Sequence, residues 1–396
     1  MTLQLSSQRL RPKWFPKSRQ LRREASIDSN RMTLSNLRNK PGIIAAIPVA
    51  LALLLFNIAV RGHSEEDTNG DKVIKSVRAG GEGGFDYLSA DVEARRLYVP
   101  RSGPTGRLTV WDLDTLEPVG EIPGLAAGGA VADSKSGHGF STTMPVTMWD
   151  AKTLKPIKTI PVQSRPDGIL FDPYKERVWV FSHGTPQATV IDAVEGTVVG
   201  AIDLGGAAEQ AVTDGQGKLY VNLTDKSTIA VIDANQLAVT ARYDLSGTAN
   251  NAGGLAFDAK NHILFSYCHR PSPVAVIVNA DTGKVITTLP TGNGVDTAGF
   301  DPTTMEAFSA QGDGTLTIIK ELSPTNFVVE QNVKTMVGGK TLAMDTKLHH
   351  AIVIAAEFGP APTPPPVGGR GGRRQMIPGS FTILMIGKLP EVQRER

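Results

Sequence analysis

Cysteine is nearly absent from this chain, since Cys268 is the only one among 396 residues. A single cysteine cannot form an intramolecular disulfide or a cysteine metal cluster, and it cannot supply the paired thiols that attach a c-type haem. No cysteine follows the apolar segment near the N-terminus, so a lipoprotein is excluded. Stability must therefore come from packing and from closure of the fold.

Several motifs of known chemistry are missing as well. The chain has no Gly-x-Ser-x-Gly elbow for a nucleophilic serine, and no two histidines have metal-site spacing. Residues 339–341 resemble the end of a phosphate-binding loop, but Lys334 stands where that loop needs its first glycine. Trp-Asp pairs at 111–112 and 149–150 lack the Gly-His that accompanies them in WD repeats. These absences leave no enzyme class favoured by a motif.

Charge is distributed unevenly along the chain. Residues 1–61 contain 11 Lys and Arg against 2 Asp and Glu, whereas the remainder has 30 against 37. The larger part of the protein is mildly acidic, which argues against a nucleic-acid surface as its main purpose.

An apolar run of eighteen residues, 43–60, follows the basic N-terminus. Its length and its basic flank predict an export signal or a single membrane anchor whose flank stays in the cytoplasm. We expect a basic, disordered segment at 1–42, the signal peptide or anchor helix at 43–61 and a linker at 62–72. This places the protein in the periplasm or cell envelope. Cleavage, and the choice of Met1 or Met32 as the start, stay open.

One short unit recurs in the rest of the chain. An aspartate preceded by small or apolar residues marks each copy: Asp91, Asp133, Asp172, Asp214, Asp258, Asp301 and Asp345. The intervals of 42, 39, 42, 44, 43 and 44 residues match the period of a four-stranded propeller blade. After residue 70 there is no long amphipathic helical pattern, and 41 glycines and 26 prolines supply turns. The repeat therefore predicts an all-β fold.

A second acid recurs at the end of the third strand in four of the repeats. It is present in four copies, as Asp112, Asp150, Asp192 and Asp233, and is replaced by Asn279 and Lys320 in the next two. A carboxylate there can accept hydrogen bonds from backbone N–H groups of the turn that follows. We expect a structural role for these acids.

The ends of the repeat array complement each other. The seventh copy ends near Lys388 without residues for a fourth strand, while residues 73–80 precede the first copy and resemble an isolated fourth strand. Pairing the two closes the ring and removes exposed sheet edges. The sequence predicts a single, monomeric seven-bladed β-propeller at 73–388 with four-stranded antiparallel blades, closed by an N-terminal strand. A Pro/Gly-rich insertion occupies 359–380 and a tail occupies 389–396.

The repeat resembles the YncE-like, YVTN-repeat β-propeller family of bacteria over residues 73–388. The resemblance rests on the marker aspartates, on the strands at 97–99 and 220–222, and on Val-Ile-Asp-Ala, Asp-Thr-Gly-Lys-Val and Thr-Leu-Pro-Thr-Gly-Asn-Gly runs. The Tyr-Val-Asn at 220–222 lacks the threonine of the strict repeat, and the second blade is shortened. The resemblance implies export to the periplasm or cell surface and a binding or scaffolding role without an assigned reaction.

Aligning the blades identifies positions that surround the central axis. Five residues before the marker aspartates stand Asp86, Gly128, Asp167, Glu209, Gly253, Asp296 and Lys340. Ca²⁺ and Mg²⁺ prefer carboxylate and carbonyl oxygens, so the four acids are candidate metal ligands. The alternative is that each acid caps its own turn or lines a wet channel.

The loops between second and third strands lie on the same face of a propeller. They contribute Arg101, His183, Asn222, His269, Gln311 and Glu357. Such varied side chains on a repetitive scaffold predict a binding rim, and we count the last five, with the four acids and Lys340, as candidate ligand-binding residues. The alternative for the two histidines is simple solvation.

Two functions stay open. The favoured one is a non-enzymatic envelope protein that presents this face to an unknown protein or small molecule. The alternative is a metal-assisted enzyme of the lactonase or lyase kind, using Ca²⁺ or Mg²⁺ on the channel-face carboxylates. The Pro/Gly-rich residues 357–380 are expected to leave this face as a flexible or polyproline excursion, suited to a lid or a partner hook.

Overall fold

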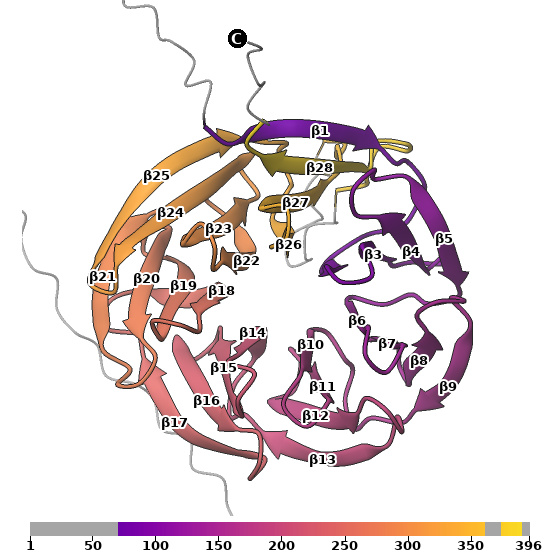
Figure 1. Ribbon diagram of the computed structural model, residues 1–396, viewed down its shortest axis with the longest axis horizontal. Coiled ribbons are helices and arrows are strands. Elements are labelled where there is room, and N and C mark those ends of the chain that lie inside the picture. Colours follow the sequence, from indigo (N-terminus) through magenta and orange to yellow (C-terminus); the bar gives the residue numbers. More distant parts are fainter. Residues whose placement is uncertain (1–69, 361–373, 390–396) are drawn as a thin grey trace, which may run out of the picture. The chain divides into compact units, whose positions relative to one another are not determined.

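The computed structural model describes residues 70–360 and 374–389, all of which belong to one compact unit. Their strands form seven four-stranded antiparallel sheets, set like blades around one axis (Figure 1). The predicted all-β, seven-bladed propeller is confirmed. Within these ranges there is no helix long and apolar enough to cross a membrane. The expected segments at 1–42 and 43–61, most of the linker and most of the C-terminal tail lie outside the described residues.

Each blade contains four strands from the axis outward, which follow chain order in the first six blades, while β1 is the outer strand of the seventh. The innermost strands are β2 (Ser89–Asp91), β6 (Ala130–Asp133), β10 (Ile169–Asp172), β14 (Ala208–Thr213), β18 (Asn250–Asp258), β22 (Val295–Asp301) and β26 (Thr341–Asp345). The second strands are β3 (Arg96–Arg101), β7 (His138–Ser141), β11 (Arg177–Phe181), β15 (Lys218–Leu223), β19 (Ile263–Arg270), β23 (Glu306–Gln311) and β27 (His350–Ala355). The third strands are β4 (Arg107–Asp112), β8 (Val146–Asp150), β12 (Gln187–Asp192), β16 (Thr228–Asp233), β20 (Val274–Asn279), β24 (Thr315–Ser323) and β28 (Thr382–Gly387). The outer strands are β5 (Pro118–Pro123), β9 (Pro156–Ile160), β13 (Val198–Asp203), β17 (Ala238–Asp244), β21 (Val285–Pro290), β25 (Asn326–Lys334) and β1 (Lys72–Arg78).

The ring is closed by its first and last strands. Strand β1 pairs antiparallel with β28, from Lys72 opposite Gly387 to Arg78 opposite Thr382. The last blade therefore has the order β1-β28-β27-β26. This confirms closure by an N-terminal strand, which leaves no open sheet edge at the junction of the two ends.

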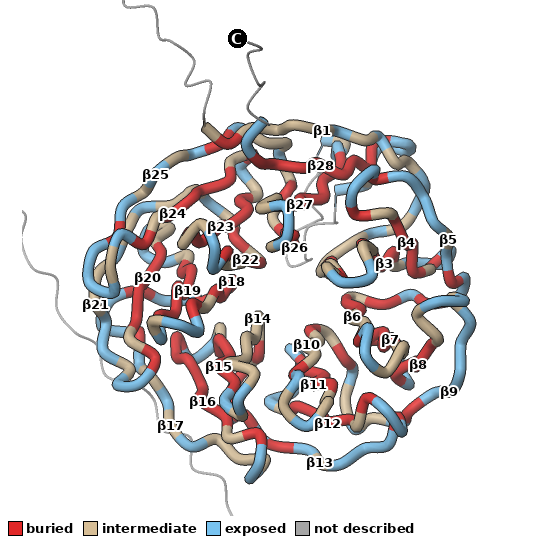
Figure 2. Tube along the Cα trace, in the orientation of Figure 1, coloured by how far each residue is buried: buried red, intermediate tan, exposed pale blue. Residues whose placement is uncertain are grey.

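Apolar side chains pack between neighbouring blades. Among the described residues there is one hydrophobic cluster at each of the seven blade junctions. Between the first two blades, for example, the tilted rings of Tyr98 and the fully buried Trp149 pack with 5.1 Å between their centroids. Buried segments accordingly follow the second and third strands, while the outer strands are exposed (Figure 2). The core is thus a set of blade interfaces around the axis.

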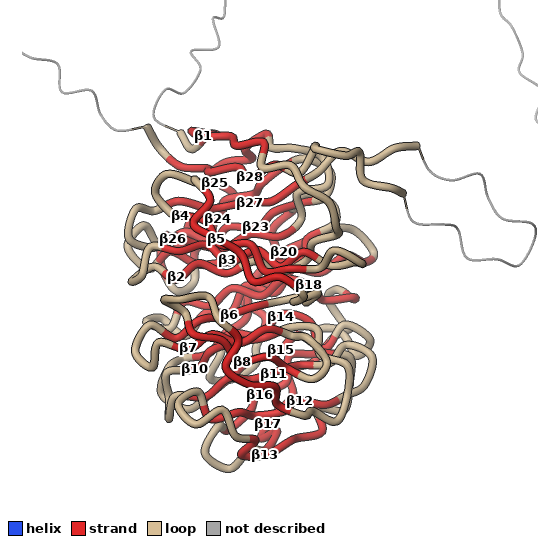
Figure 3. Tube along the Cα trace, turned by 90° about the vertical axis from the view of Figure 1, so that its right-hand side faces the viewer, coloured by secondary structure: helices blue, strands red, loops and turns tan. Residues whose placement is uncertain are grey.

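Two faces can be distinguished, and loops gather on both (Figure 3). The loop face carries the connections into the innermost strands and those between second and third strands, such as 161–168 and 182–186. The turn face carries the tight turns after the innermost and third strands, such as 112–117. Because every blade is an antiparallel meander, equivalent connections of all blades share one face.

The third-strand acids support their own turns on the turn face. Asp112 accepts hydrogen bonds from the backbone N–H groups of Asp114 and Thr115 at 3.0 and 2.7 Å. The same pattern of two backbone donors recurs at Asp150, Asp192, Asp233 and Asn279. The predicted structural role is confirmed, and Asn279 shows that the amide oxygen can replace the carboxylate.

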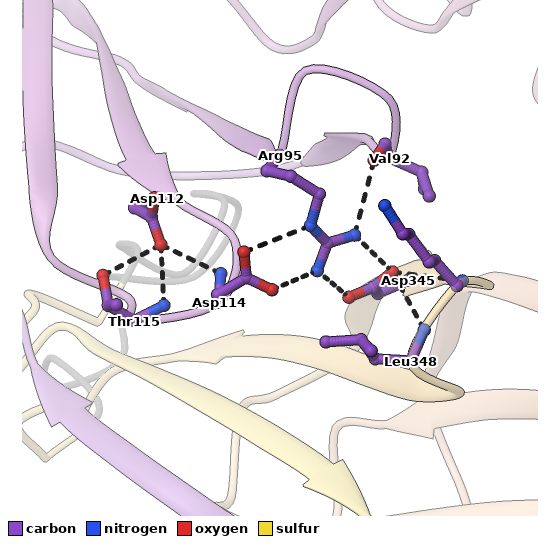
Figure 4. A network of polar contacts seen from close by, with 8 residues as sticks. Val92, Arg95, Asp112, Asp114, Thr115, Asp345 and Leu348 are labelled. Atoms are coloured by element: carbon purple, nitrogen blue, oxygen red, sulfur yellow. Dashed lines mark hydrogen bonds and ion pairs between the residues drawn. The ribbon is translucent and has the colours of Figure 1, made fainter.

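Arg95 joins the first and last blades on the turn face (Figure 4). Its guanidinium donates to both carboxylate oxygens of Asp345, at 2.8 and 2.5 Å, and also binds Asp114 at 2.6 Å. The Asp345 side chain is fully buried, whereas nearly half of the Asp114 side chain is exposed. Although burial opposes ionisation, the Arg95 contact outweighs it and lowers the pKa of Asp345.

Candidate functional site

The axial ring lies where the sequence alignment places it, at the loop-face ends of the innermost strands. Asp86, Asp167 and Lys340 come shortly before β2, β10 and β26, while Glu209 and Asp296 are early residues of β14 and β22. Their charges act on one another across the axis, because Asp86 feels the other four. We call these five residues the axial ring.

Lys340 and Asp296 form an ion pair between the sixth and seventh blades. Their backbones are joined as well, since the Asp296 N–H donates to the Lys340 carbonyl at 3.0 Å. Burial disfavours both charges and raises the pKa of Asp296 even though Lys340 opposes the shift. For Lys340, burial is outweighed by Asp296 and Asp86, so the pKa rises. The lysine neutralises one acid of the axial ring.

Glu209, in the fourth blade, is held by residues from two other blades. The Tyr87 hydroxyl of the first blade donates to Glu209 Oε1 at 3.0 Å, and His183 Nδ1 of the third blade lies 3.0 Å from Oε2. The hydrogen bond from His183 to Glu209 raises the pKa of the imidazole to about 9, against the effect of burial. At neutral pH this histidine is therefore a cation paired with a carboxylate.

Asp86 and Asp167 differ from the other two acids. Neither carboxylate has a hydrogen bond or an ion pair to another residue in the described part of the chain. Burial, followed by repulsion from Asp167, Asp296 and Glu209, raises the pKa of Asp86 to about 7, although Lys340 opposes the shift. Burial and Glu209 also raise the pKa of Asp167. These two acids have unused acceptor capacity.

His269 occupies the place that Gly253 leaves in the ring. A Cβ on Gly253 would lie 2.8 Å from Nε2 of His269, so the imidazole fills the space of the missing side chain. Burial lowers the pKa of His269, although Asp296 and Glu209 favour its charged form. A neutral histidine thus stands beside the charged Lys340–Asp296 pair.

The position after each ring residue also reaches the axis, and sequence reasoning missed it. Gln210 accepts from the backbone N–H groups of Leu255 and Ala298 and donates to the Ala298 carbonyl, each at 2.8 Å, which ties three blades together. Tyr87 occupies the same register in the first blade. Three of the seven equivalents are glycines: Gly129, Gly168 and Gly254. Three glycines at positions equivalent to Tyr87 and Gln210 leave room for these two long side chains, and this pattern could have indicated from the sequence that both reach the axis.

The prediction that Asn222 and Gln311 belong to the binding rim is wrong. Asn222 and Gln311 are fully buried, because they are the penultimate residue of β15 and the last residue of β23 and not loop residues. The Asn222 amide donates to the carbonyls of Gly253 and Gly254 at 2.9 Å, and that of Gln311 donates to Ser309 Oγ at 2.8 Å. Neither side chain can reach a ligand.

Arg101 also has a structural role. Its guanidinium is buried, lies 3.8 Å above the centre of the Phe381 ring, and donates to the carbonyls of Gly80 and Gly83. It fastens the segment that follows β1. Burial lowers the pKa of Arg101 to about 10.

Glu357 remains exposed at the base of the Pro/Gly-rich insertion. Its carboxylate lies 3.6 Å from the Arg78 guanidinium. Two backbone hydrogen bonds close the base, from Gly359 N–H to the Gln375 carbonyl and from Ile377 N–H to the Glu357 carbonyl. The middle of the insertion, 361–373, lies outside the described residues.

The two predicted loop histidines line two depressions on the loop face. His183 lines one of about 260 Å³, together with residues that include Asp203, Asp225 and Lys226. His269 lines one of about 510 Å³, together with Asn251, Arg270, Pro271, Pro273 and Asn293. Both volumes flank the axial ring on blades three to six.

The predicted cation site gains no support from the geometry. Within 70–360 and 374–389, no three His, Cys, Asp or Glu side chains are grouped so that they could hold a metal ion. Asp296 and Glu209 are instead engaged by Lys340 and His183. Ca²⁺ or Mg²⁺ at Asp86, Asp167, Glu209 and Asp296 stays a prediction.

Comparison with known proteins yields the fold. No family model and no curated protein matches the chain. Among solved structures, "Structure of U3-55K" superposes with a TM-score of 0.64 at 10% identity, covering 80% of this chain and 99% of that one. "Crystal structure of RRP9 WD40 repeats" superposes with a TM-score of 0.62 at 10% identity, covering 80% and 97%. At this identity the likeness concerns the propeller architecture.

Proposed function

We propose that the protein is an exported, YncE-like β-propeller that acts as a binding or scaffolding module through its loop face. The YVTN-type repeat supports the family, and the apolar run at 43–60 behind a basic flank supports export. Propellers commonly serve as rigid platforms whose loops carry the recognition chemistry.

A contrast between the faces carries the proposal. On the turn face, acids such as Asp112 and Asp345 are bound by their own turns or by Arg95. On the loop face, Asp86 and Asp167 are partly accessible, and their carboxylates have no hydrogen-bonding or ionic partner among the described residues. Unused acceptors on one face favour a partner that supplies donors, such as the lysines or arginines of a protein.

Site-specific photo-crosslinking tests which face is used. A photoreactive phenylalanine analogue replaces Met144, an exposed loop-face residue, or Val194, an exposed turn-face residue. We expect a discrete crosslinked product in intact cells from position 144 and none from 194. The Met144 product should disappear in the Asp86→Asn/Asp167→Asn double variant.

Comparison of the products from positions 144 and 194 decides the outcome. Equal products from both positions, or a product from 194 alone, would contradict use of the loop face. Thermal unfolding of each variant shows whether the propeller is intact, so that loss of a product is not attributed to unfolding.

Export is tested with a reporter enzyme that is active only outside the cytoplasm, fused after Ser64. We expect activity from chains that start at Met1 or at Met32, because both retain residues 43–60. Cytoplasmic fractionation of both fusions would refute export.

A metal-assisted lactonase or lyase is the second candidate. It rests on four carboxylates around one axis, two of them without partners. Lactone hydrolysis with added Ca²⁺ or Mg²⁺ that is lost on replacing Asp167, Glu209 and Asp296 with Ala would establish it. Absence of turnover with both metals would exclude it for those substrates.

A further inference from the structure

The fifth blade rises above its neighbours on the loop face. Its inner hairpin is the longest of the seven, with nine residues in β18 and eight in β19, and its ladder extends to Asn250 opposite Arg270. The other innermost strands have three to seven residues. The extra pairs build a wall that ends in Asn251 and Arg270, beside the 510 Å³ depression.

The side chains around this depression are donors. Arg270 offers guanidinium N–H groups, Asn251 and Asn293 offer amide N–H groups, and His269 offers an imidazole, while no carboxylate lines the depression. Within the described ranges, the side chains of Arg270, Asn251 and Asn293 form no hydrogen bonds and no ion pairs. The depression therefore has unused donor groups and no carboxylate, in contrast to the axis.

The wall is held in a defined backbone shape. Asn251 has a φ of 62°, and apart from glycine only Ser227 shares a positive φ on the described loop face. The Asn251 N–H donates to Ser227 Oγ at 3.2 Å, which fastens this conformation to the fourth blade. Asparagine adopts this left-handed region more readily than most residues, and the bond to Ser227 holds the backbone at this corner.

Pro271 and Pro273 form the apolar side of the depression. Proline has no N–H, so this side cannot compete for acceptors and offers only nonpolar contact. The volume lies within the range of small-molecule sites. The geometry therefore suits a small molecule with an anionic head and a compact body.

We propose that the depression between blades five and six binds a small anion through a carboxylate or phosphate group, with Arg270 as its main partner. Asn251 and Asn293 donate to the flanking oxygens, and the prolines contact the body of the ligand. Guanidinium groups bind both oxyanions in a bidentate manner, so the two head groups share this chemistry. The proposal rests on the proposed function only in that both use the loop face.

Calorimetric titration tests this site in the full-length protein, at 150 mM salt. The probes are inorganic phosphate, citrate and glucuronate, with neutral glucose as the control. We expect binding of at least one anion and none of glucose. Phosphate alone, or the carboxylates alone, would identify the head group.

Arg270→Gln should weaken that binding by about tenfold or more, because a charged hydrogen-bonding partner is lost. Lys226→Gln removes one positive charge from the other depression on the same face and should leave the affinity within about twofold. Asn293→Ala should weaken binding less than Arg270→Gln.

Two outcomes overturn the proposal: no heat with any of the three anions, or equal weakening by the Arg270 and Lys226 variants. Unchanged thermal midpoints show that each variant is folded. Failure here leaves the Met144 crosslink intact, whereas failure of the crosslink with intact anion binding would refute the partner-binding role alone.

Discussion

The hydroxyl of Tyr87 donates a hydrogen bond across the propeller axis to Glu209, from the first blade to the fourth. Most blade contacts join neighbours, so this bond links parts of the ring that share no interface. It also leaves Glu209 Oε2 for His183. The centre of the loop face is thus organised by a tyrosine, an acid and a histidine from three separate blades.

Tyr87→Phe should lower the free energy of unfolding by about 1–2 kcal/mol, because Glu209 loses a partner while the aromatic ring is retained. Chemical denaturation measures the change. Tyr174→Phe, on the turn face, is the control and should have little effect. Equal stability of the Tyr87 variant and the parent would show that the cross-axis bond contributes nothing.

Glu209→Gln should lower the pKa of His183 from about 9 toward its ordinary value, because the hydrogen bond and the charge that raise it are lost. A histidine whose folded pKa is raised adds stability that is fully present below about 6.5 and is lost as pH rises through about 9. The parent should therefore lose stability over that interval, and the variant should not. NMR titration checks the pKa, with the His262 resonances as an unaffected reference.

Glu321→Gln should remove a pH dependence of the same sign, in a lower pH interval. Burial raises the pKa of Glu321 to about 7, helped by Asp258 and opposed by the hydrogen bond from Asn261. The folded state holds a proton that the unfolded state releases above about 4.5, so the parent loses stability as pH rises from there to about 7. Denaturation at pH 5 and 8 measures this slope. The exposed Glu117→Gln control should retain the slope.

Asp345→Asn and Asp114→Asn compare the two acids that bind Arg95. The first removes the buried charge partner of Arg95, leaves only the half-exposed Asp114, and should cost about 1.5–3 kcal/mol of unfolding free energy. The second removes a half-exposed partner and should cost less than about 1 kcal/mol. Thermal and chemical unfolding measure both. Equal costs would contradict a role for the buried pair in holding the first blade to the last.

The sequence was sufficient for the fold because a propeller is periodic. The spacing of the marker aspartates revealed the blades, and the unmatched strand near the N-terminus revealed the closure. The axial ring followed from the same alignment, since equivalent positions of equivalent blades point to one axis.

The side chains that give the site its chemistry differ from blade to blade, so alignment of the repeats could not predict their contacts. His269 reaches the axis only because Gly253 has no side chain and β19 is longer than its equivalents. Asn222 and Gln311 were assigned to loops, but their strands run further and bury them. Gln210 and Tyr87 form hydrogen bonds to other blades because their side chains are long, and this length does not follow from their position in the repeat.

The pairing of Lys72 with Gly387 also constrains how the molecule folds. Of the described strands, β1 is synthesised first and must wait for β28, so ring closure joins strands far apart in the sequence and is expected to be slow. Until then, β1 and β28 each present a free edge that can pair with another molecule. A chain that lacks β1 or β28 is expected to form an open arc that is prone to aggregation. Ring closure therefore depends on both strands being present.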